Sequence, residues 1–467
     1  MTVTDQVSHV FQVEVEKKLP MAVHGKGAYI SIEDPSTGET KTYIDSSTGA
    51  AVGSLGHGDP EVIEEMCKAA KESVYSFPVT VCNYAAEDLA EFIIQESPKG
   101  AFASALFTGS GSESNENAMK IIRQYHNEKG DTKRVKFISR KQSYHGYTLG
   151  ALSIGDNCRK EGFTEILLPQ EITPKVSQVY AYRNTKEGET LEQYKDRLLQ
   201  EVEETFIENG PETVAAFICE TVGGSTYGNP LPIPGYLDGV RDICHKYGAL
   251  FMLDEVMCGM GRCGTLHAWE QFITLADGSK GFVGPDIQTI GKTLGSGYVT
   301  IAGVLVSPKV KDVFVNGSGK ILGAQTYHSH AFNCRVALAV QKKVSRDKLV
   351  QNIYNVGNYL GERLTELLTK TKIVGDVRGR GGFWSFEIVK DQKTKEPFPV
   401  ELDVAHKIGN KIYEFGATNM AAQGTIDGVK GDHILFAPSF IITKELVDQV
   451  IEYVFRAVTE VEAELGI

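Results

Sequence analysis

The chain has 467 residues, 42% of them hydrophobic, and a formal net charge of −12 at pH 7. This length allows one large domain with a substantial core and a second, smaller one. The acidic balance disfavours nucleic acid or an anionic membrane as the main partner, because both would require a basic surface. No apolar run approaches the roughly 20 residues that a membrane-spanning helix needs, so no membrane partner is expected.

The cysteines and the N-terminal residues favour a cytoplasmic location. The eight cysteines are scattered and never form a CxxC motif, as expected for reduced thiols without a zinc site. The first ten residues, MTVTDQVSHV, lack the basic start and the apolar stretch of a secretory signal. They also contain no arginine, which disfavours a mitochondrial presequence.

The order of polar and apolar segments predicts an α/β fold. Short strands with turns are expected over residues 27–45, and from residue 60 onward helices alternate with short apolar runs. A charged surface helix is expected over 186–208, and an amphipathic helix near the C-terminus. Each apolar run ends in polar or glycine-rich residues, where open α/β sheets bind their ligands. Four runs are predicted to be buried parallel strands, namely residues 105–107, 135–138, 214–218 and 249–253.

The first candidate site follows the apolar run that ends at Phe107, where residues 108–116 read TGSGSESNE. The glycines let a ligand approach the backbone closely, and Ser112 offers a hydroxyl. Free N–H groups at the start of a helix bind a phosphate dianion well. This segment taken alone is equally consistent with an ordinary helix cap that binds nothing.

Asp254 is the second candidate, because it places a carboxylate at the end of the apolar run 249–253. A buried carboxylate needs a cationic or hydrogen-bonding partner. A protonated pyridine nitrogen would serve, since the carboxylate keeps the ring able to accept electrons. The alternative is a structural aspartate that caps a nearby loop.

Lys292 is the third candidate and stands between an apolar run and the glycine-rich turn 295–297. Partial burial there would favour the neutral amine that attacks an aldehyde. Most lysines are solvated, so this position alone would not single it out. The order of the three features does: a phosphate-binding segment, then a carboxylate, then a lysine.

Two motifs imitate nucleotide-binding sites. Residues 259–264, GMGRCG, have the spelling GxGxxG, but Asp254 and Glu255 lie between the strand and the glycines, and no clear apolar helix follows. Gly291 and Lys292 imitate the end of a phosphate-binding loop, but the required first glycine is replaced by Asp286. A nicotinamide-dependent dehydrogenase is therefore only a remote alternative.

Taken in order, these motifs resemble the class III aminotransferases (ornithine/ω-amino acid type), which are pyridoxal 5′-phosphate enzymes of fold type I. The resemblance spans about residues 27–443 and includes SYHGYT at 143–148 and QTYHSH at 325–330. It implies a large domain with a mostly parallel seven-stranded sheet flanked by helices, and a small α+β domain built from both chain ends. The bounds we expect are 1–64 and 336–467 for the small domain and 65–335 for the large, cofactor-binding domain.

The resemblance also assigns the residues that carry the chemistry. Lys292 is implied to form a Schiff base with pyridoxal phosphate and to move the substrate proton. Asp254 is implied to pair with the pyridine nitrogen. Gly111 and Ser112 are implied to bind the phosphate.

Four further residues receive cofactor-binding roles in the same way. Tyr144 and Val256 are implied to pack on opposite faces of the pyridine ring, and Glu220 to lie near the cofactor. Thr326 is implied to reach the phosphate bound in the partner subunit, which predicts a homodimer with shared active sites.

Three departures from the family pattern concern the substrate. Met257 replaces a glutamine that contacts the cofactor in many relatives, and Ala331 replaces a proline. Residues 418–443 contain no arginine, although relatives that use α-keto acids often place a carboxylate-binding arginine there. Lys430 lies in that region, but a lysine lacks the two-pronged fork of a guanidinium.

The predicted reaction moves an amino group from an amine or amino acid to a keto acid or aldehyde. The scaffold also supports decarboxylating transamination, racemisation, aminomutation and phospho-lyase chemistry, and the residues above exclude none of them. A non-catalytic relative that only binds a ligand is the alternative from another class. The identities of donor and acceptor are not readable from these motifs.

Overall fold

The structure is a computed structural model that describes residues 8–13, 15, 18–274 and 283–467. The first seven residues, on which the expectation about a signal sequence rests, lie outside the described residues. Among the described helices, none combines the length and apolarity that a membrane crossing requires.

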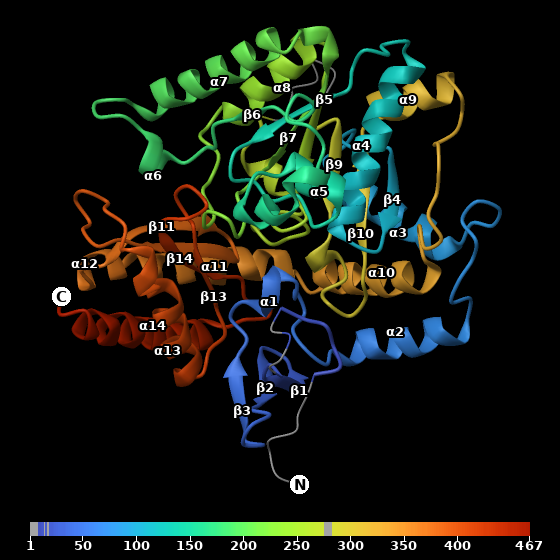
Figure 1. Ribbon diagram of the computed structural model, residues 1–467. Helices are drawn as coiled ribbons and strands as arrows, with labels where there is room; N and C mark the ends of the chain where they lie inside the picture. Colours follow the sequence, from blue (N-terminus) through green and yellow to red (C-terminus); the bar gives the residue numbers. More distant parts are fainter. Residues whose placement is uncertain (1–7, 14, 16–17, 275–282) are drawn as a thin grey trace.

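A seven-stranded sheet forms the centre of the larger part of the molecule (Figure 1). The strands lie in the order β4-β10-β9-β8-β7-β5-β6, and the pairs from β6 through β5, β7 and β8 to β9 are all parallel. This confirms the mostly parallel sheet. The strands are β4 (Ser104–Thr108), β5 (Lys136–Arg140), β6 (Lys175–Val176), β7 (Val214–Glu220), β8 (Leu250–Asp254), β9 (Ile287–Ile290) and β10 (Ala302–Val306).

The prediction for residues 105–107 was wrong in one respect. They form the middle of β4, but β4 pairs only with β10, and that pairing is antiparallel. The chain reverses its direction after β9 and Lys292, so β10 is antiparallel to both of its neighbours, β9 and β4. An apolar run shows that a strand is buried, but it does not show the direction of its neighbour.

Helices cover both faces of this sheet, which explains why the central strands β7 and β8 are buried along their whole length. Phe217 and Cys219 of β7 share a core with the helices of one face, and Ala216 and Ile218 share a core with those of the other. The first face carries α3 (Tyr84–Glu96), α7 (Leu191–Glu208), α8 (Tyr236–Lys246) and α10 (Ala331–Arg346). The second carries α4 (Gly111–Glu128), α5 (Leu149–Ile154) and α9 (Pro308–Asn316).

The charged helix expected over 186–208 is α7. It begins at Leu191 because Thr190 and Gln193 form a capping box. The shorter helical segments are α6 (Ala181–Asn184), α12 (Leu367–Lys370), η1 (Cys158–Ile166), η2 (Pro211–Thr213), η3 (Ala268–Gln271), η4 (Lys292–Leu294) and η5 (Val400–Leu402).

Both chain ends build the smaller part of the molecule, as expected (Figure 1). Ile44, Leu55 and Val62 pack in one core with residues from the C-terminal third of the chain. The N-terminal elements are β1 (Met21–Lys26), β2 (Tyr29–Glu33), β3 (Thr40–Ile44), α1 (Thr48–Ala51) and α2 (Pro60–Lys71). The C-terminal elements are α11 (Leu349–Thr365), β11 (Val374–Arg380), β12 (Phe383–Ile388), α13 (Val404–Phe415), β13 (Met420–Gln423), β14 (Asp432–Phe436) and α14 (Lys444–Glu464).

Helix α10 joins the two parts, since Ala337 packs in the core of the large sheet and Val340 in the core of the smaller part. The expected boundary between residues 335 and 336 falls inside this helix. The domain bounds 1–64, 65–335 and 336–467 stay a prediction.

Candidate active site

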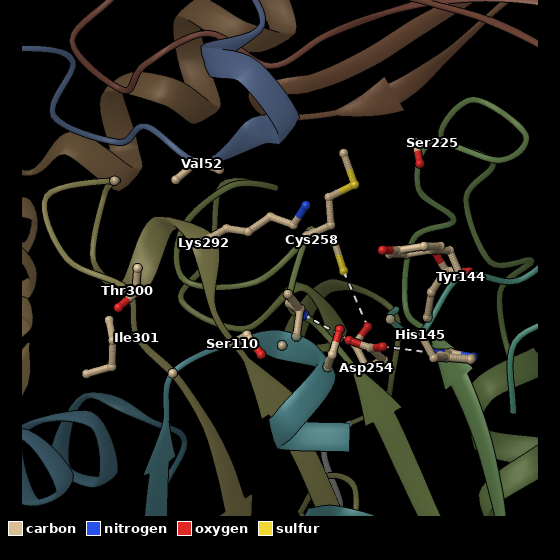
Figure 2. A pocket seen from close by; sticks show the side chains of 18 of the residues that line it. Val52, Ser110, Tyr144, His145, Ser225, Asp254, Cys258, Lys292, Thr300 and Ile301 are labelled. Atoms are coloured by element: carbon tan, nitrogen blue, oxygen red, sulfur yellow. Dashed lines mark hydrogen bonds and ion pairs between the residues drawn. The ribbon is translucent and has the colours of Figure 1, made fainter. Parts of the chain in front are cut away.

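A cavity of about 410 Å³ lies at the carboxyl-terminal edge of the parallel strands. Figure 2 shows Lys292 and Tyr144 entering it from opposite sides, with Asp254 and Ser110 near its floor. The structure brings seven of the eight predicted site residues to its wall, namely Gly111, Ser112, Tyr144, Glu220, Asp254, Val256 and Lys292.

Thr326 is the exception, because it is exposed on the loop before α10 and does not line this cavity. Its predicted role concerns the site of a second subunit. A single chain does not test that role, and it stays a prediction.

The start of helix α4 forms one wall of the cavity. The helix begins at Gly111, one residue before Ser112, because the Ser110 hydroxyl caps it by accepting a hydrogen bond from the Glu113 amide (3.2 Å). The Ser112 hydroxyl accepts a hydrogen bond from the Tyr147 amide (2.9 Å), which ties the loop that carries Tyr144 to the helix start. The first N–H groups of a helix have no partner within it, so this end is suited to an anion.

Gly111 is needed here for its lack of a side chain. A Cβ atom at this position would lie 2.7 Å from Cγ1 of Val256, far inside van der Waals contact. We therefore expect Gly111→Ala to displace Val256 or the helix start and to weaken cofactor binding by roughly tenfold or more, the equivalent of a 1–3 kcal/mol overpacking cost. Equilibrium titration of the cofactor-free protein with pyridoxal phosphate measures this change.

The matched control is Gly162→Ala, since a Cβ at Gly162 would have no atom within 4 Å. Equal affinities of the two variants would contradict the steric argument.

Asp254 ends β8 and is only 5% exposed. Its Oδ2 lies 2.8 Å from Nδ1 of His145 and accepts a hydrogen bond from Nδ2 of Asn115 (2.9 Å). Its Oδ1 accepts hydrogen bonds from the Thr289 hydroxyl (3.0 Å) and the Val256 amide (3.1 Å). This network fixes the carboxylate and compensates it for the loss of water.

The sequence interpretation missed the three side-chain partners of Asp254, two of which, His145 and Asn115, come from distant parts of the chain. His145 belongs to SYHG and Asn115 to the segment after the phosphate-binding glycines, so both stood inside motifs already singled out. Nothing in their spacing indicates that they meet Asp254, because each contact spans more than 100 residues.

Glu220 ends the neighbouring strand β7. Its Oε1 accepts a hydrogen bond from the Gly224 amide (2.9 Å), whereas its buried Oε2 has no partner among the described residues. Burial raises the pKa of Glu220, although the nearby His145 and Arg140 act in the opposite direction. Arg140 binds the backbone carbonyl of Glu220 rather than its carboxylate, so no arginine neutralises this side chain in the described structure.

Lys292 follows β9 and has a positive φ of 44°. Its side chain is half-buried, and Nζ donates a hydrogen bond to the carbonyl oxygen of Ala50 in α1 (3.0 Å). Burial lowers the pKa of Lys292 from 10.5 to about 8, and the charge of Asp254 only partly offsets this. A substantial fraction of the amine is therefore neutral, and nucleophilic, near physiological pH.

This pKa gives a testable pH dependence. Only the neutral amine attacks an aldehyde, so the rate at which cofactor-free protein captures pyridoxal phosphate should rise with pH and level off above about 8. Stopped-flow absorbance over the neutral to alkaline range measures it. A rate that keeps rising up to about 10.4, the value for an ordinary lysine, would contradict the effect of burial.

The residues around the cavity fit pyridoxal phosphate. The α4 N-terminus suits its phosphate, the fixed Asp254 carboxylate suits a protonated ring nitrogen, and the Lys292 amine suits its aldehyde. Glu220 also lines this cavity.

Comparison with known proteins shows which proteins this chain resembles. The chain is 41% identical to an uncharacterized aminotransferase of Schizosaccharomyces pombe, covering 99% of this chain and 97% of that one. It is 32% identical to a vanillin aminotransferase of Capsicum chinense, covering 90% of this chain and 88% of the relative. A transaminase structure from the marine bacterium Virgibacillus superposes with a TM-score of 0.87 at 30% identity, covering 98% and 96% of the two chains.

The fold and the site together define a pyridoxal phosphate-dependent transaminase of fold type I. The family model for aminotransferase class-III matches residues 10–458, so the chain belongs to the class III aminotransferase family. The protein is an enzyme that transfers amino groups with pyridoxal phosphate as its cofactor.

Proposed function

We propose that Lys292 is the residue that holds the cofactor covalently and moves the proton in this aminotransferase. The observation that carries the proposal is the convergence of Lys292, Asp254 and the α4 N-terminus on one cavity. Gly111 and Ser112 would hold the phosphate, Tyr144 and Val256 the two ring faces, and Asp254 the ring nitrogen.

When bound, pyridoxal phosphate acts as an electron sink that acidifies a C–H bond next to the substrate nitrogen. Lys292 is suited to take up that proton at Nζ, because its lowered pKa keeps part of the amine neutral. Four hydrogen-bonding partners hold the Asp254 side chain in place, so its carboxylate is suited to stabilise a positive charge on the ring nitrogen. The buried side chains of Val222 and Ile301 and the half-buried Val256 form an apolar part of the wall, which would limit water at the reacting carbon.

The donor class we propose is a primary amine or amino acid, and the acceptor class a keto acid or an aldehyde. The likeness to a relative named for vanillin supports the inclusion of aldehydes. A homodimer in which Thr326 of one subunit serves the site of the other is part of the proposal, as is a cytoplasmic location. The eight free thiols suit a reducing compartment.

The test is a panel of donors and acceptors applied to the purified holoenzyme. The bound cofactor should make the protein yellow, an amine donor should bleach the colour, and a carbonyl acceptor should restore it. A carbonyl product and a new amine should form in equal amounts. Racemised or decarboxylated products without a new amine would contradict transamination, and sedimentation at two concentrations tests the dimer.

A further inference from the structure

The cavity wall contains two carboxylates and only one lysine or arginine. Among the described residues that line it, Glu220 and Asp254 are acidic, and Lys292 is the only Lys or Arg side chain. Lys292 has a covalent and proton-transfer role in the proposed function. A substrate that carries a carboxylate would therefore need a further cation close to the cavity.

Arg159 is placed to supply that cation. It lies in η1, and its guanidinium carbon stands over the ring of Tyr144, 4.9 Å from the ring centroid. Tyr144 itself lines the cavity, so the guanidinium lies one side chain away from the cavity space. Stacking on an aromatic ring fixes the plane of a guanidinium and leaves its N–H edge free to bind an anion.

The guanidinium of Arg159 has no acidic partner. The side chain is exposed, and no carboxylate of the described residues lies within ion-pair distance of it. Its neighbour Lys160 differs in this respect, because Nζ of Lys160 is paired with Oδ1 of Asp156 (2.5 Å). Of these two adjacent cations, only Arg159 keeps its charge available for a ligand.

The charge of Arg159 affects the pKa values of two residues that line the cavity, Tyr144 and Lys292. Burial raises the pKa of the Tyr144 hydroxyl, and the guanidinium of Arg159 opposes that rise. Arg159 also contributes to the lowered pKa of Lys292, after the larger effects of burial and Arg262. An anion bound at Arg159 would thus act electrostatically on Lys292.

The segment before Arg159 also packs against the loop between β13 and β14, where no arginine occurs. A Cβ on Gly428 of that loop would lie 4.0 Å from both Cβ and the amide nitrogen of Cys158. Gln142 Nε2 donates to the carbonyl oxygen of Gly424 (2.6 Å), which holds the start of the loop beside the same segment. Arg159 therefore offers a guanidinium close to the region 418–443, which itself contains none.

We propose that Arg159 is a specificity-determining residue that binds the carboxylate of an amino acid donor or keto acid acceptor beside Tyr144. This proposal rests on the proposed function. Substrates without a carboxylate, such as simple amines and aldehydes, do not use Arg159.

The experiment measures carboxylate binding without turnover. The holoenzyme is titrated with propionate and, separately, with the neutral propionamide, and binding is followed by calorimetry and by the visible absorbance of the bound cofactor. In Arg159→Met the Kd for propionate should rise roughly 10- to 100-fold, as for the loss of a charged hydrogen bond, while the response to propionamide stays unchanged. Arg159→Lys should give an intermediate Kd, because it keeps the charge but loses the fork.

Lys160→Met is the matched control for local damage in η1 and should leave both titrations unchanged, since the Lys160 charge is already paired. Steady-state kinetics give a second readout. With isopropylamine as the donor, KM for pyruvate should rise in Arg159→Met, whereas KM for propanal should not.

Wild-type protein that binds propionate no more tightly than propionamide would overturn the proposal, as would an equal effect of Arg159→Met on both ligands. A loss of pyridoxal phosphate affinity in Arg159→Met would reassign the residue to the cofactor. Failure of the proposed function has a different signature, because wild-type protein would then transfer no amine to pyruvate or to propanal.

Discussion

Lys292→Ala should lower kcat by roughly 10⁴-fold or more, because in the proposed function this one side chain supplies both the covalent anchor and the proton carrier. Alanine keeps the backbone and removes Nζ, which in the structure bonds only to the Ala50 carbonyl among described groups. The variant loses no ion pair among the described residues, so the free energy of unfolding should change little. Single-turnover kinetics with the cofactor added in excess would measure the loss.

The N-terminus of α4, which we propose binds the phosphate, is intact in Lys292→Ala, so this variant should still bind pyridoxal phosphate without a covalent bond. Dialysis should then remove the cofactor from the variant but not from the wild type. Lys120→Ala is the control, since Lys120 is an exposed lysine of α4 that does not line the cavity. A Lys292→Ala variant that keeps a tenth of wild-type kcat would refute the assignment.

The sequence predicted well those parts of the site that depend on a short stretch of the chain. Asp254 and Lys292 each follow an apolar strand, and α4 begins after the glycines that follow β4. Parallel strands bring their carboxyl ends to one edge of a sheet, so residues at those ends are expected to meet. The order of the motifs was therefore sufficient to place seven predicted residues around one cavity.

The contacts between distant segments could not be predicted in this way. Asn115 and His145 meet Asp254 only because α4 and the loop after β5 pack over the end of β8. Arg159 lies in a short helical segment with no periodic pattern, and its relation to Tyr144 depends on the path of that loop. Likewise, the antiparallel direction of β10 follows from the turn after Lys292, which has no signal in the apolar run itself.

Asp254→Asn should lower kcat on the order of 10²- to 10³-fold, as expected when a fixed charge that stabilises the reacting state is removed. The change keeps the size of the side chain but removes the negative charge that, in the proposed function, keeps the ring nitrogen protonated. Some stability should also be lost, about 1–3 kcal/mol, because an amide cannot accept all the hydrogen bonds from Asn115, Thr289, His145 and the Val256 amide.

A second buried aspartate, Asp286, provides the control that distinguishes a loss of stability from a loss of catalysis. Asp286 is 3% exposed, is paired with His245 (2.9 Å) and Lys309 (3.0 Å), and does not line the cavity. Asp286→Asn should therefore destabilise the fold while leaving kcat per folded molecule near the wild-type value. A comparable loss of kcat in both variants would attribute the effect of Asp254→Asn to damaged packing.

A cofactor analogue sharpens this distinction. Pyridoxal phosphate methylated at the ring nitrogen is permanently cationic, so it needs no carboxylate to keep its charge. If Asp254 acts by maintaining that charge, the analogue should restore part of the kcat lost in Asp254→Asn. In the wild type, four hydrogen-bonding partners hold the Asp254 carboxylate in place. The methyl group of the analogue should therefore clash with this carboxylate, and the analogue should not raise the wild-type kcat. If the analogue raises kcat in Asp254→Asn but not in the wild type, Asp254 acts through its charge. If it does not raise kcat in the variant, Asp254 acts by positioning His145 and Asn115.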